Sequence, residues 1–177
     1  MQQEQKAFGG DPDRVTIFGE SAGSVSVYYQ LLINRGDHTY RGKPLFRGAI
    51  MDSRSVFPVT SVNSPKPQGI YNAIVEASDC THEWDTLGCL RALPYDKFKL
   101  AVNAVPNYLS YSGNLDLSYL PRPDPKDQFF SEYPEIAAAR GWFARVPAII
   151  GDQEDEGTTF ALPLNNVTTT EDLVDYV

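Results

Sequence analysis

The clearest chemical signal in the sequence is the pentapeptide Gly19-Glu20-Ser21-Ala22-Gly23, which fits the Gly-x-Ser-x-Gly pattern of a nucleophile elbow. In such an elbow a serine sits on a tight turn that lifts its hydroxyl clear of the sheet, and flanking glycines let strand and helix approach closely. The N–H of Ala22, at the start of the next helix, would donate to an oxyanion. The pattern predicts Ser21 as a nucleophile. A glycine-rich turn in which the serine only caps a helix is the alternative.

A second group of candidate functional residues follows an apolar run, in the segment Gly151-Asp-Gln-Glu-Asp-Glu-Gly157. A serine triad needs a carboxylate that orients the histidine and stabilises the imidazolium. In open α/β sheets such groups lie on loops beyond the carboxyl ends of strands. A solvated acidic loop is the alternative for any one of them. Four carboxylates qualify, and their spacing does not choose among them: Asp152, Glu154, Asp155 and Glu156.

Both groups follow short runs whose composition is typical of buried strands. Residues 15–18 are β-branched or aromatic and come after the turn-like Asp11-Pro12-Asp13. Residues 48–51 and 146–150 are apolar runs of similar length. The segment 22–33 has apolar residues three to four positions apart, the spacing of one helical face. We therefore expect Ser21 between a strand and an amphipathic helix.

The rest of the chain alternates in a similar way. The sequence predicts a loop over residues 54–68 and a long irregular connection over 106–127, which holds four prolines. Strands separated by helices indicate the α/β class, with a mostly parallel sheet covered by helices on both faces. At 177 residues we expect one domain, residues 1–177, without internal repeats. Helical patterns cover residues 69–78, 84–92, 95–104 and 135–143.

Composition and charge exclude several classes of protein. With 42% hydrophobic residues the chain can bury a sizeable core, so wholesale disorder is excluded. Its 15 basic residues against 23 acidic ones give a net charge of −8 without a basic cluster, which argues against nucleic acid as a partner. No uninterrupted apolar stretch approaches the roughly 18 residues of a membrane span. The first residues lack the pattern of a signal peptide.

The two cysteines, Cys80 and Cys89, lie nine positions apart. A zinc site needs about four ligands, and the only histidines, His38 and His82, make no close ligand spacing with this pair, so no metal or cofactor is expected. The cysteines predict either a local disulfide or two buried free thiols. The glycosylation sequon Asn166-Val167-Thr168 is compatible with a secreted protein.

Residues 8–24, Phe8-Gly-Gly-Asp-Pro-Asp-Arg-Val-Thr-Ile-Phe-Gly-Glu-Ser-Ala-Gly-Ser24, closely resemble the elbow region of type-B carboxylesterases, the family of cholinesterases and certain fungal lipases. The resemblance implies an α/β-hydrolase fold, with Ser21 as nucleophile, Ala22 as an oxyanion-hole donor and Glu156 as triad acid. It also implies a Cys80–Cys89 disulfide and, for the parent family, secretion. Further stretches resemble the fungal lipase branch, in order along the chain: Gly42-Lys-Pro-Leu-Phe-Arg47, Ala49-Ile-Met51, Pro121-Arg-Pro-Asp124, and Gln153-Glu-Asp-Glu-Gly-Thr158 continuing to Asn166-Val-Thr-Thr169.

The sequence also departs from this family in ways that bear on activity. The family's triad runs serine, glutamate, histidine, whereas only 21 residues follow Glu156 and none is a histidine. Only 18 residues precede Gly19, so the family's early strands, its signal peptide and the paired glycines of its oxyanion hole are missing. Arg54 stands where the family usually has a glycine. We therefore expect an internal fragment of an esterase.

His38 and His82 are the two alternatives for the missing base. His38 lies in the polar segment Arg35-Gly-Asp-His-Thr-Tyr40 and His82 lies in the cysteine loop. Both are expected to be solvated surface residues, because the base of such a fold lies on a loop past the last strand. Without a base, the serine hydroxyl stays a weak nucleophile at neutral pH. We therefore expect the 177-residue chain alone to hydrolyse esters weakly or not at all.

The expected function is that of a carboxylic ester hydrolase, which acts on small-molecule or lipid esters through a serine acyl-enzyme. One alternative is a non-catalytic cholinesterase-like binding module, which the absent histidine favours and the intact Ser21 opposes. Another is a different serine hydrolase, such as a peptidase or thioesterase. Several oily side chains could line an acyl pocket, although packing is the simpler role for most of them: Phe57, Tyr108, Leu109, Tyr111, Leu115 and Tyr119.

Overall fold

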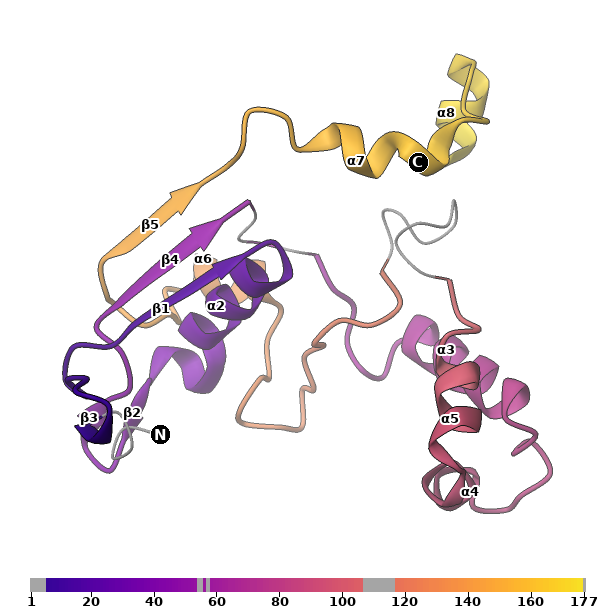
Figure 1. Cartoon of the computed structure of the whole chain (residues 1–177), viewed down its shortest axis with the longest axis horizontal. Coiled ribbons are helices and arrows are strands. Elements are labelled where there is room, and N and C mark those ends of the chain that lie inside the picture. The colour runs from indigo at the N-terminus through magenta and orange to yellow at the C-terminus, as the bar shows by residue number, and fades with distance from the viewer. Residues whose placement is uncertain (1–5, 54–55, 57, 107–116, 177) are drawn as a thin grey trace. The chain divides into compact units, whose positions relative to one another are not determined.

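The computed structural model describes residues 6–53, 56, 58–106 and 117–176 of the chain. Contacts divide the chain into two compact units, one of Met1–Ser61 with Pro121–Glu154 and one of Val62–Leu120 with Asp155–Val177. The first unit holds a parallel sheet with its helices, and the described part of the second unit is helical (Figure 1). Each unit has a hydrophobic core of its own.

The first unit is built on a parallel sheet of three strands in the order β1-β4-β5. β1 spans Thr16–Glu20, β4 spans Gly48–Asp52 and β5 spans Ala148–Gly151, which confirms the three strands expected from the apolar runs. β5 begins later than expected, because Pro147 has no N–H to donate to a ladder. Since the strands are parallel, all three carboxyl ends meet at one edge of the sheet.

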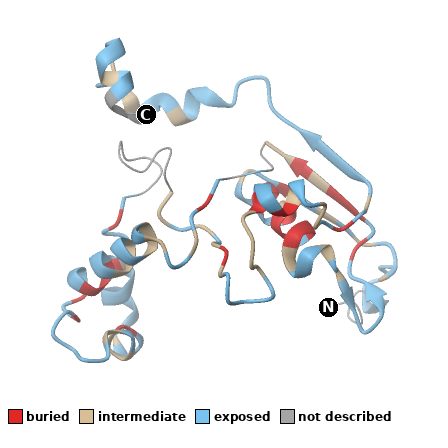
Figure 2. Cartoon of the chain, turned by 180° about the vertical axis from the view of Figure 1, so that it is seen from behind, coloured by how far each residue is buried: buried red, intermediate tan, exposed pale blue. Residues whose placement is uncertain are grey.

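Helix α2, Ala22–Leu32, packs on one face of this sheet, and the short helix α6, Pro134–Ala139, lies beside it (Figure 1). One side of α2 contacts the core formed with β4, and another side contacts the cluster formed with α6. Figure 2 shows buried positions on α2 and β4, whereas β5 is exposed along its length. The buried apolar residues of α2 are Val25, Val27, Tyr29, Leu31 and Leu32.

The opposite face of the sheet carries no helix of this unit within the described residues. Phe18 on β1, Ile50 on β4 and Ile149 on β5 are in register, so their side chains share this face. Phe18 and Ile149 are each 65% exposed, and Ile50 between them is half-buried. The helices of the first unit therefore cover one face of the sheet and leave an apolar row on the other.

A short antiparallel hairpin, which the sequence pattern did not indicate, lies at the amino-terminal edge of the sheet (Figure 1). β2 spans Thr39–Tyr40 and β3 spans Lys43–Pro44, and Arg41-Gly42 between them have φ of 52° and 76°. Two left-handed residues make a type I′ turn, which usually carries Asn-Gly. The N–H of Arg47 donates to the carbonyl of Val15 at 2.8 Å, which ties the hairpin to the start of β1.

In the second unit, helices α3, Pro65–Ala77, α4, Thr86–Ala92, and α5, Tyr95–Val102, pack around a shared core. The three helices were expected, but the prediction of a loop through residue 68 was wrong at its end. Helix α3 begins at Pro65, because the first turn of a helix does not need the N–H that proline lacks. The buried residues of this core are Ile74, Val75, Cys80, Leu90, Ala101 and Val105.

Three short helical segments follow the acidic loop, and the sequence pattern predicted none of them. They are α7, Gly157–Ala161, the 3-10 helix η3, Leu162–Leu164, and α8, Thr170–Tyr176. None of the helices in the described ranges combines the length and the apolar character needed to cross a lipid bilayer.

Candidate active site

Ser21 occupies the junction between β1 and α2 in a strained backbone conformation. β1 ends at Glu20, α2 begins at Ala22, and Ser21 between them has φ 54° and ψ −117°. A positive φ is uncommon for a residue with a side chain and persists where the surrounding structure enforces it. The strand, sharp turn and helix are the arrangement that a nucleophile elbow requires.

Close packing between this strand and helix depends on Gly19. A Cβ atom on Gly19 would overlap the carbonyl group of Gly23 and would lie 2.7 Å from the backbone nitrogen of Ser24. A Cβ atom on Gly23 would meet no atom within 4 Å. The motif suggested the same role for both glycines, but the structure assigns it to Gly19, against which the backbone of Gly23 packs.

Two hydrogen bonds hold the backbone of Ser21. Its N–H donates to the carbonyl oxygen of Asp52 at 3.0 Å, which continues the contact between β1 and β4 past the end of β1. Its carbonyl accepts the N–H of Val25 at 3.1 Å, at the start of α2. Ala22 is the first residue of α2, and N–H groups in the first turn have no partner within the helix. This position, where the helix dipole favours negative charge, is compatible with the predicted oxyanion-hole role of Ala22.

The acidic loop leaves the sheet at the same edge as Ser21, since it follows the carboxyl end of β5. Within it, the Asp155 carboxylate accepts a hydrogen bond from the Thr158 hydroxyl, with oxygens 2.7 and 2.8 Å away. Glu156 is exposed and immediately precedes α7. Ser21 and Glu156 belong to different units, and their pairing stays a prediction.

His38 lies in the first unit, at a distance from Ser21. It follows the carboxyl end of α2, whose 11 residues span about 16 Å from Ser21. Its carbonyl accepts the N–H of Leu45 at 2.9 Å, so it belongs to the hairpin at the amino-terminal edge of the sheet. Its ring packs on Phe46 with centroids 4.7 Å apart, and its Nδ1 lies 3.5 Å from the Gly36 carbonyl. The expectation of a solvated His38 is therefore wrong in part, because this histidine is half-buried.

His82 and Tyr119 belong to the second unit. His82 is exposed on the cysteine loop, as expected. Tyr119 is 53% exposed, and its hydroxyl donates to the carbonyl of Val102 at 2.8 Å. Burial of its ring raises the pKa of Tyr119 above the ordinary value. The remaining candidates for an acyl pocket lie outside the described residues, as does Arg54: Phe57, Tyr108, Leu109, Tyr111 and Leu115.

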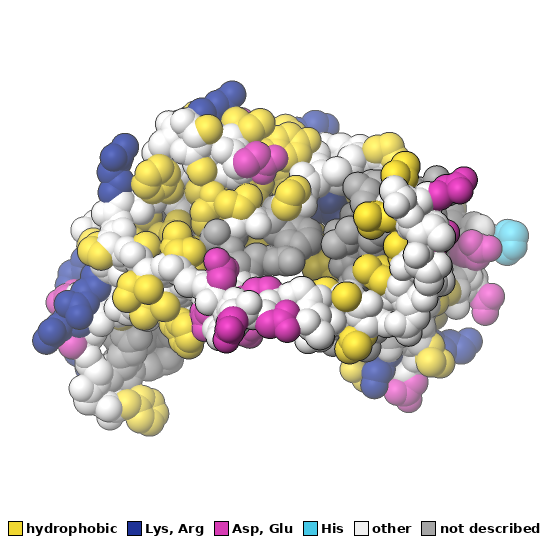
Figure 3. Space-filling model, turned by 90° about the horizontal axis from the view of Figure 1, so that it is seen from above, with side chains coloured by type: hydrophobic (Ala, Val, Ile, Leu, Met, Phe, Trp, Pro, Cys, Tyr) yellow, Lys and Arg dark blue, Asp and Glu magenta, His cyan; other side chains and the backbone are white. Residues whose placement is uncertain are grey.

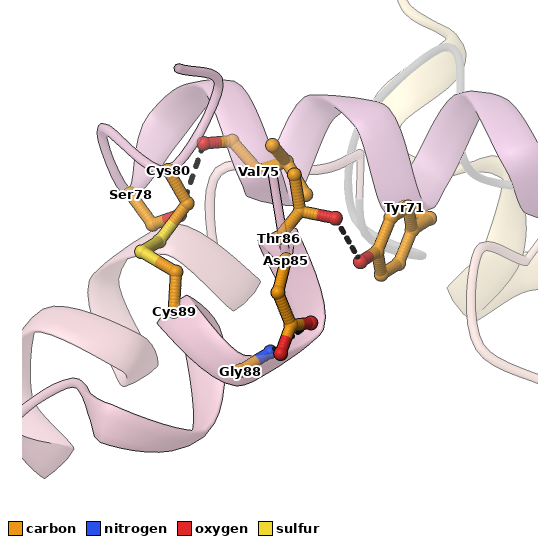
Figure 4. The surroundings of a disulfide bond; sticks show 8 residues. All are labelled: Tyr71, Val75, Ser78, Cys80, Asp85, Thr86, Gly88 and Cys89. Atoms are coloured by element: carbon orange, nitrogen blue, oxygen red, sulfur yellow. Dashed lines mark hydrogen bonds between the residues drawn. A yellow bond between two sulfur atoms is a disulfide. The ribbon is translucent and has the colours of Figure 1, made fainter. Parts of the chain in front are cut away.

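Cys80 and Cys89 form a disulfide, which confirms the expected pairing (Figure 4). Their Cα atoms lie 5.9 Å apart, and Cys80 is fully buried. The N–H of Cys80 also donates to the carbonyl of Val75 at 3.0 Å, and Asp85 caps α4 by accepting the N–H of Gly88 at 2.8 Å. The disulfide thus fastens the chain that follows α3 to helix α4.

The predicted glycosylation site at Asn166 lies between η3 and α8 and is exposed. The hydroxyl and the N–H of Thr168 both donate to the carboxylate of Asp172, at 3.2 and 3.0 Å. Exposure makes Asn166 accessible to modification, and its glycosylation stays a prediction.

The structure places further polar side chains beside the elbow that the motifs did not single out. Gln153 Nε2 donates to Asp52 Oδ1 at 2.9 Å, and the Ser53 hydroxyl donates to the same oxygen at 3.3 Å. Asp52 and Gln153 are 101 positions apart, so no local pattern could have paired them. Strand order would have been the signal, because Asp52 pairs with Glu20 on one side and with Gly151 on the other.

Comparison with known proteins points to one group. Residues 1–175 match the Carboxylesterase family. The chain is 53% identical over 171 residues to the secreted triacylglycerol lipase LIP1 of Gibberella zeae, a match that covers 97% of this chain and 29% of that protein. It is 51% identical over 162 residues to Lipase 4 of Diutina rugosa, covering 92% of this chain and 29% of that protein. The chain thus spans about three tenths of the length of these curated relatives.

Solved esterase structures share the arrangement of the chain. EstA of Aspergillus niger matches with a TM-score of 0.80 and 30% identity, covering 99% of this chain and 32% of that one. A thermophilic PNB esterase matches with a TM-score of 0.69 and 28% identity, covering 96% of this chain and 32% of that one.

Proposed function

Since the chain belongs to the carboxylesterase family and forms part of an α/β-hydrolase fold, we propose that it supplies the nucleophile of an enzyme that hydrolyses carboxylic esters. The observation that carries this proposal is Ser21, held at φ 54° between β1 and α2. A strained serine at a strand–helix junction presents its hydroxyl to a substrate above the sheet.

In the proposed reaction, the Ser21 hydroxyl oxygen attacks the ester carbonyl carbon while a base accepts its proton. The resulting oxyanion accepts a hydrogen bond from the N–H of Ala22, and one such donor stabilises the transition state by about 3 kcal/mol. The intermediate then breaks its bond to the alcohol, which leaves with the proton returned by the base. Water attacks the acyl-enzyme in the same way, releasing the carboxylic acid and restoring Ser21.

We assign the triad acid to Glu156. Support comes from the resemblance of residues 153–158 to the family's acid segment and from the start of this segment after the carboxyl end of β5, the edge of the sheet at which β1 leads into Ser21. A carboxylate in this role orients the histidine and stabilises the imidazolium, without itself forming a bond to the substrate. Glu156→Gln should therefore lower kcat less than Ser21→Ala does.

The base in this proposal is a histidine outside these 177 residues. His38 lies at the opposite end of α2 from Ser21, and its ring is packed on Phe46. His82 is exposed on the loop closed by the disulfide. The 177-residue chain alone should accordingly show little turnover of an ester, because its serine has no base to accept the proton.

The substrate class follows from the relatives. Their names, a secreted triacylglycerol lipase and a lipase, favour esters of fatty acids, small or lipid, over peptides or thioesters. The word secreted in the name of the Gibberella zeae lipase favours a location outside the cell for this protein as well, where a disulfide persists and Asn166 would be available for glycosylation.

A segment exchange tests the proposal. In the segment-exchanged lipase, this chain replaces the matching segment of the Gibberella zeae lipase, and hydrolysis of p-nitrophenyl butyrate is followed. We expect activity, and Ser21→Ala should reduce kcat by about 10⁴-fold or more. Ser26→Ala, an exposed serine on the same helix, is the matched control and should keep kcat within about twofold. Full activity in the Ser21→Ala variant would overturn the proposal.

A further inference from the structure

The peptide group between Asp52 and Ser53 is hydrogen-bonded on both sides. Its carbonyl accepts the N–H of Ser21 at 3.0 Å, and its N–H donates to the carbonyl of Gly151 at 2.8 Å. One peptide group at the end of the central strand β4 therefore joins the elbow after β1 to the end of β5. A rotation of this peptide would break both bonds at once.

The side chain of Asp52 makes a second link to the same end of β5. Asp52 Oδ1 accepts the Gln153 amide at 2.9 Å, and hydrogen bonds to a carboxylate are stronger than those between neutral groups. Gln153 stands two residues beyond β5 and three residues before Glu156 in the sequence. Asp52 thus contacts the elbow through its backbone and the start of the acidic loop through its side chain.

Strain and charge at this edge explain why such a link is needed. Ser21 and Ser53 have φ of 54° and 58°, so the chain turns sharply after both β1 and β4. Glu20 and Asp52 are register partners, which places two carboxylates on the same face of adjacent strands. Two like charges held side by side repel each other. The Gln153 amide donates to one of these carboxylates and adds no charge of its own.

We propose that Asp52 and Gln153 are a positioning pair for the ester hydrolysis, and this inference rests on the proposed function of Ser21. In this role both side chains position other groups and form no bond to the substrate. The pair holds the Asp52–Ser53 peptide in the orientation that fixes the Ser21 N–H, and it fixes the point from which the loop to Glu156 departs. Loss of the pair therefore lowers kcat and leaves KM nearly unchanged.

Reversal of the hydrogen bond tests the pair in the segment-exchanged lipase. Gln153→Glu places a carboxylate against Asp52 and should lower kcat about tenfold, with KM within about twofold. Adding Asp52→Asn lets the new amide at position 52 donate to the new carboxylate at position 153. The double variant Asp52→Asn/Gln153→Glu should therefore recover kcat to within about threefold of the parent. The matched control is Gln68→Glu, which makes the same amide-to-carboxylate change at the exposed Gln68–Asn72 hydrogen bond of 2.8 Å on α3, in the second unit, and should leave kcat unchanged. An unaltered kcat in Gln153→Glu, or a double variant no better than it, overturns the inference.

Hydrogen exchange separates this inference from the proposed function, because it needs no catalysis. On the 177-residue chain, exchange of the Ser21 amide should be about tenfold faster in Gln153→Glu than in the parent, and should return to the parent rate in the double variant. If the segment-exchanged lipase fails to hydrolyse esters but these exchange rates change as stated, the proposed function is wrong, and only the hold of the pair on the Ser21 amide is supported. Equal exchange rates of the Ser21 amide in the parent, the Gln153→Glu variant and the double variant would overturn the inference.

Discussion

At the scale of single residues, the proposed function depends most on the backbone conformation of Ser21. A left-handed conformation at a residue with a side chain costs on the order of 1–3 kcal/mol, so neighbouring contacts must offset it. The bond from its N–H to Asp52 and the close approach of α2 over Gly19 are such contacts. The strained conformation of Ser21 is thus maintained by residues that take no part in the proposed reaction.

The two glycines of the elbow should differ sharply when each is changed to alanine. Gly19→Ala inserts a methyl group into the backbone of Gly23 and should lower the free energy of unfolding by about 3 kcal/mol. Gly23→Ala enters open space within α2 and should raise it by up to about 1 kcal/mol, because alanine favours helix. Urea unfolding at low protein concentration measures both. Equal effects of the two substitutions would show that Gly19 does not carry the packing.

The buried side chain of Tyr29 leads us to expect that the stability of the chain depends on pH in the alkaline range. Burial, with smaller contributions from Glu135 and Tyr28, raises the pKa of Tyr29 from 10.0 to about 12, against a lowering effect of Arg122. Below pH 10 the hydroxyl is protonated in both states. Between pH 10 and 12 the unfolded chain loses this proton while the folded chain keeps it, so the free energy of unfolding falls as the pH rises.

Tyr29→Phe should remove the part of the stability loss at alkaline pH that comes from this hydroxyl. At pH 8 it should keep the stability or raise it by about 1 kcal/mol, because the buried hydroxyl has no hydrogen-bond partner among the described residues. The comparison is urea unfolding at pH 8 and pH 11, with Tyr95→Phe, at a side chain 72% exposed, as the control. The same alkaline loss in Tyr29→Phe as in the parent chain would contradict the assignment.

At the scale of elements, local sequence patterns predicted the strands and the helix whose formation depends on neighbouring residues in the sequence. The β-branched and apolar runs gave β1, β4 and β5, and the spacing of apolar residues gave α2 to within one residue. The hairpin was missed because strands of two residues have no periodicity and its turn carries Arg-Gly. The pairing of Asp52 with Gln153 was missed because it depends on which strands are neighbours, which no local pattern encodes.

The disulfide should stabilise the second unit through the chain that it closes. A disulfide between cysteines at a sequence separation of nine raises the free energy of unfolding by about 2–3 kcal/mol, mainly by restricting the unfolded chain. Cys80→Ser/Cys89→Ser should therefore lower the free energy of unfolding by that amount, as measured by urea unfolding. The parent chain in reducing agent is the control and should match the double variant. Two free thiols in peptide maps of secreted, unreduced protein would refute the pairing.

At the scale of the molecule, the first unit presents an uncovered apolar surface. Phe18 and Ile149 are each 65% exposed on the sheet face opposite α2, and β5 is an outer strand. Figure 3 shows hydrophobic side chains gathered at the surface over the sheet-bearing unit, on the left of that view. Exposed apolar faces and open strand edges promote association between chains.

We therefore expect the 177-residue chain to associate with itself at tens of micromolar concentration. Ile149→Lys, which puts a charge on the outer strand, should shift the chain toward monomer in size-exclusion chromatography with light scattering. Leu100→Lys, at a side chain 72% exposed in the second unit, is the matched control and should leave the distribution unchanged. A parent chain that elutes as a monomer over this range would contradict the prediction.

Covalent labelling tests the central claim, that Ser21 is the nucleophile of an ester hydrolase. Diethyl p-nitrophenyl phosphate transfers its phosphoryl group to an activated serine and releases p-nitrophenol, and peptide mass mapping locates the product. In the segment-exchanged lipase, one diethyl phosphoryl group should appear on Ser21 as hydrolysis of p-nitrophenyl butyrate is lost, and none should appear in Ser21→Ala. Loss of activity with the group on another residue, and Ser21 unmodified, would contradict the account.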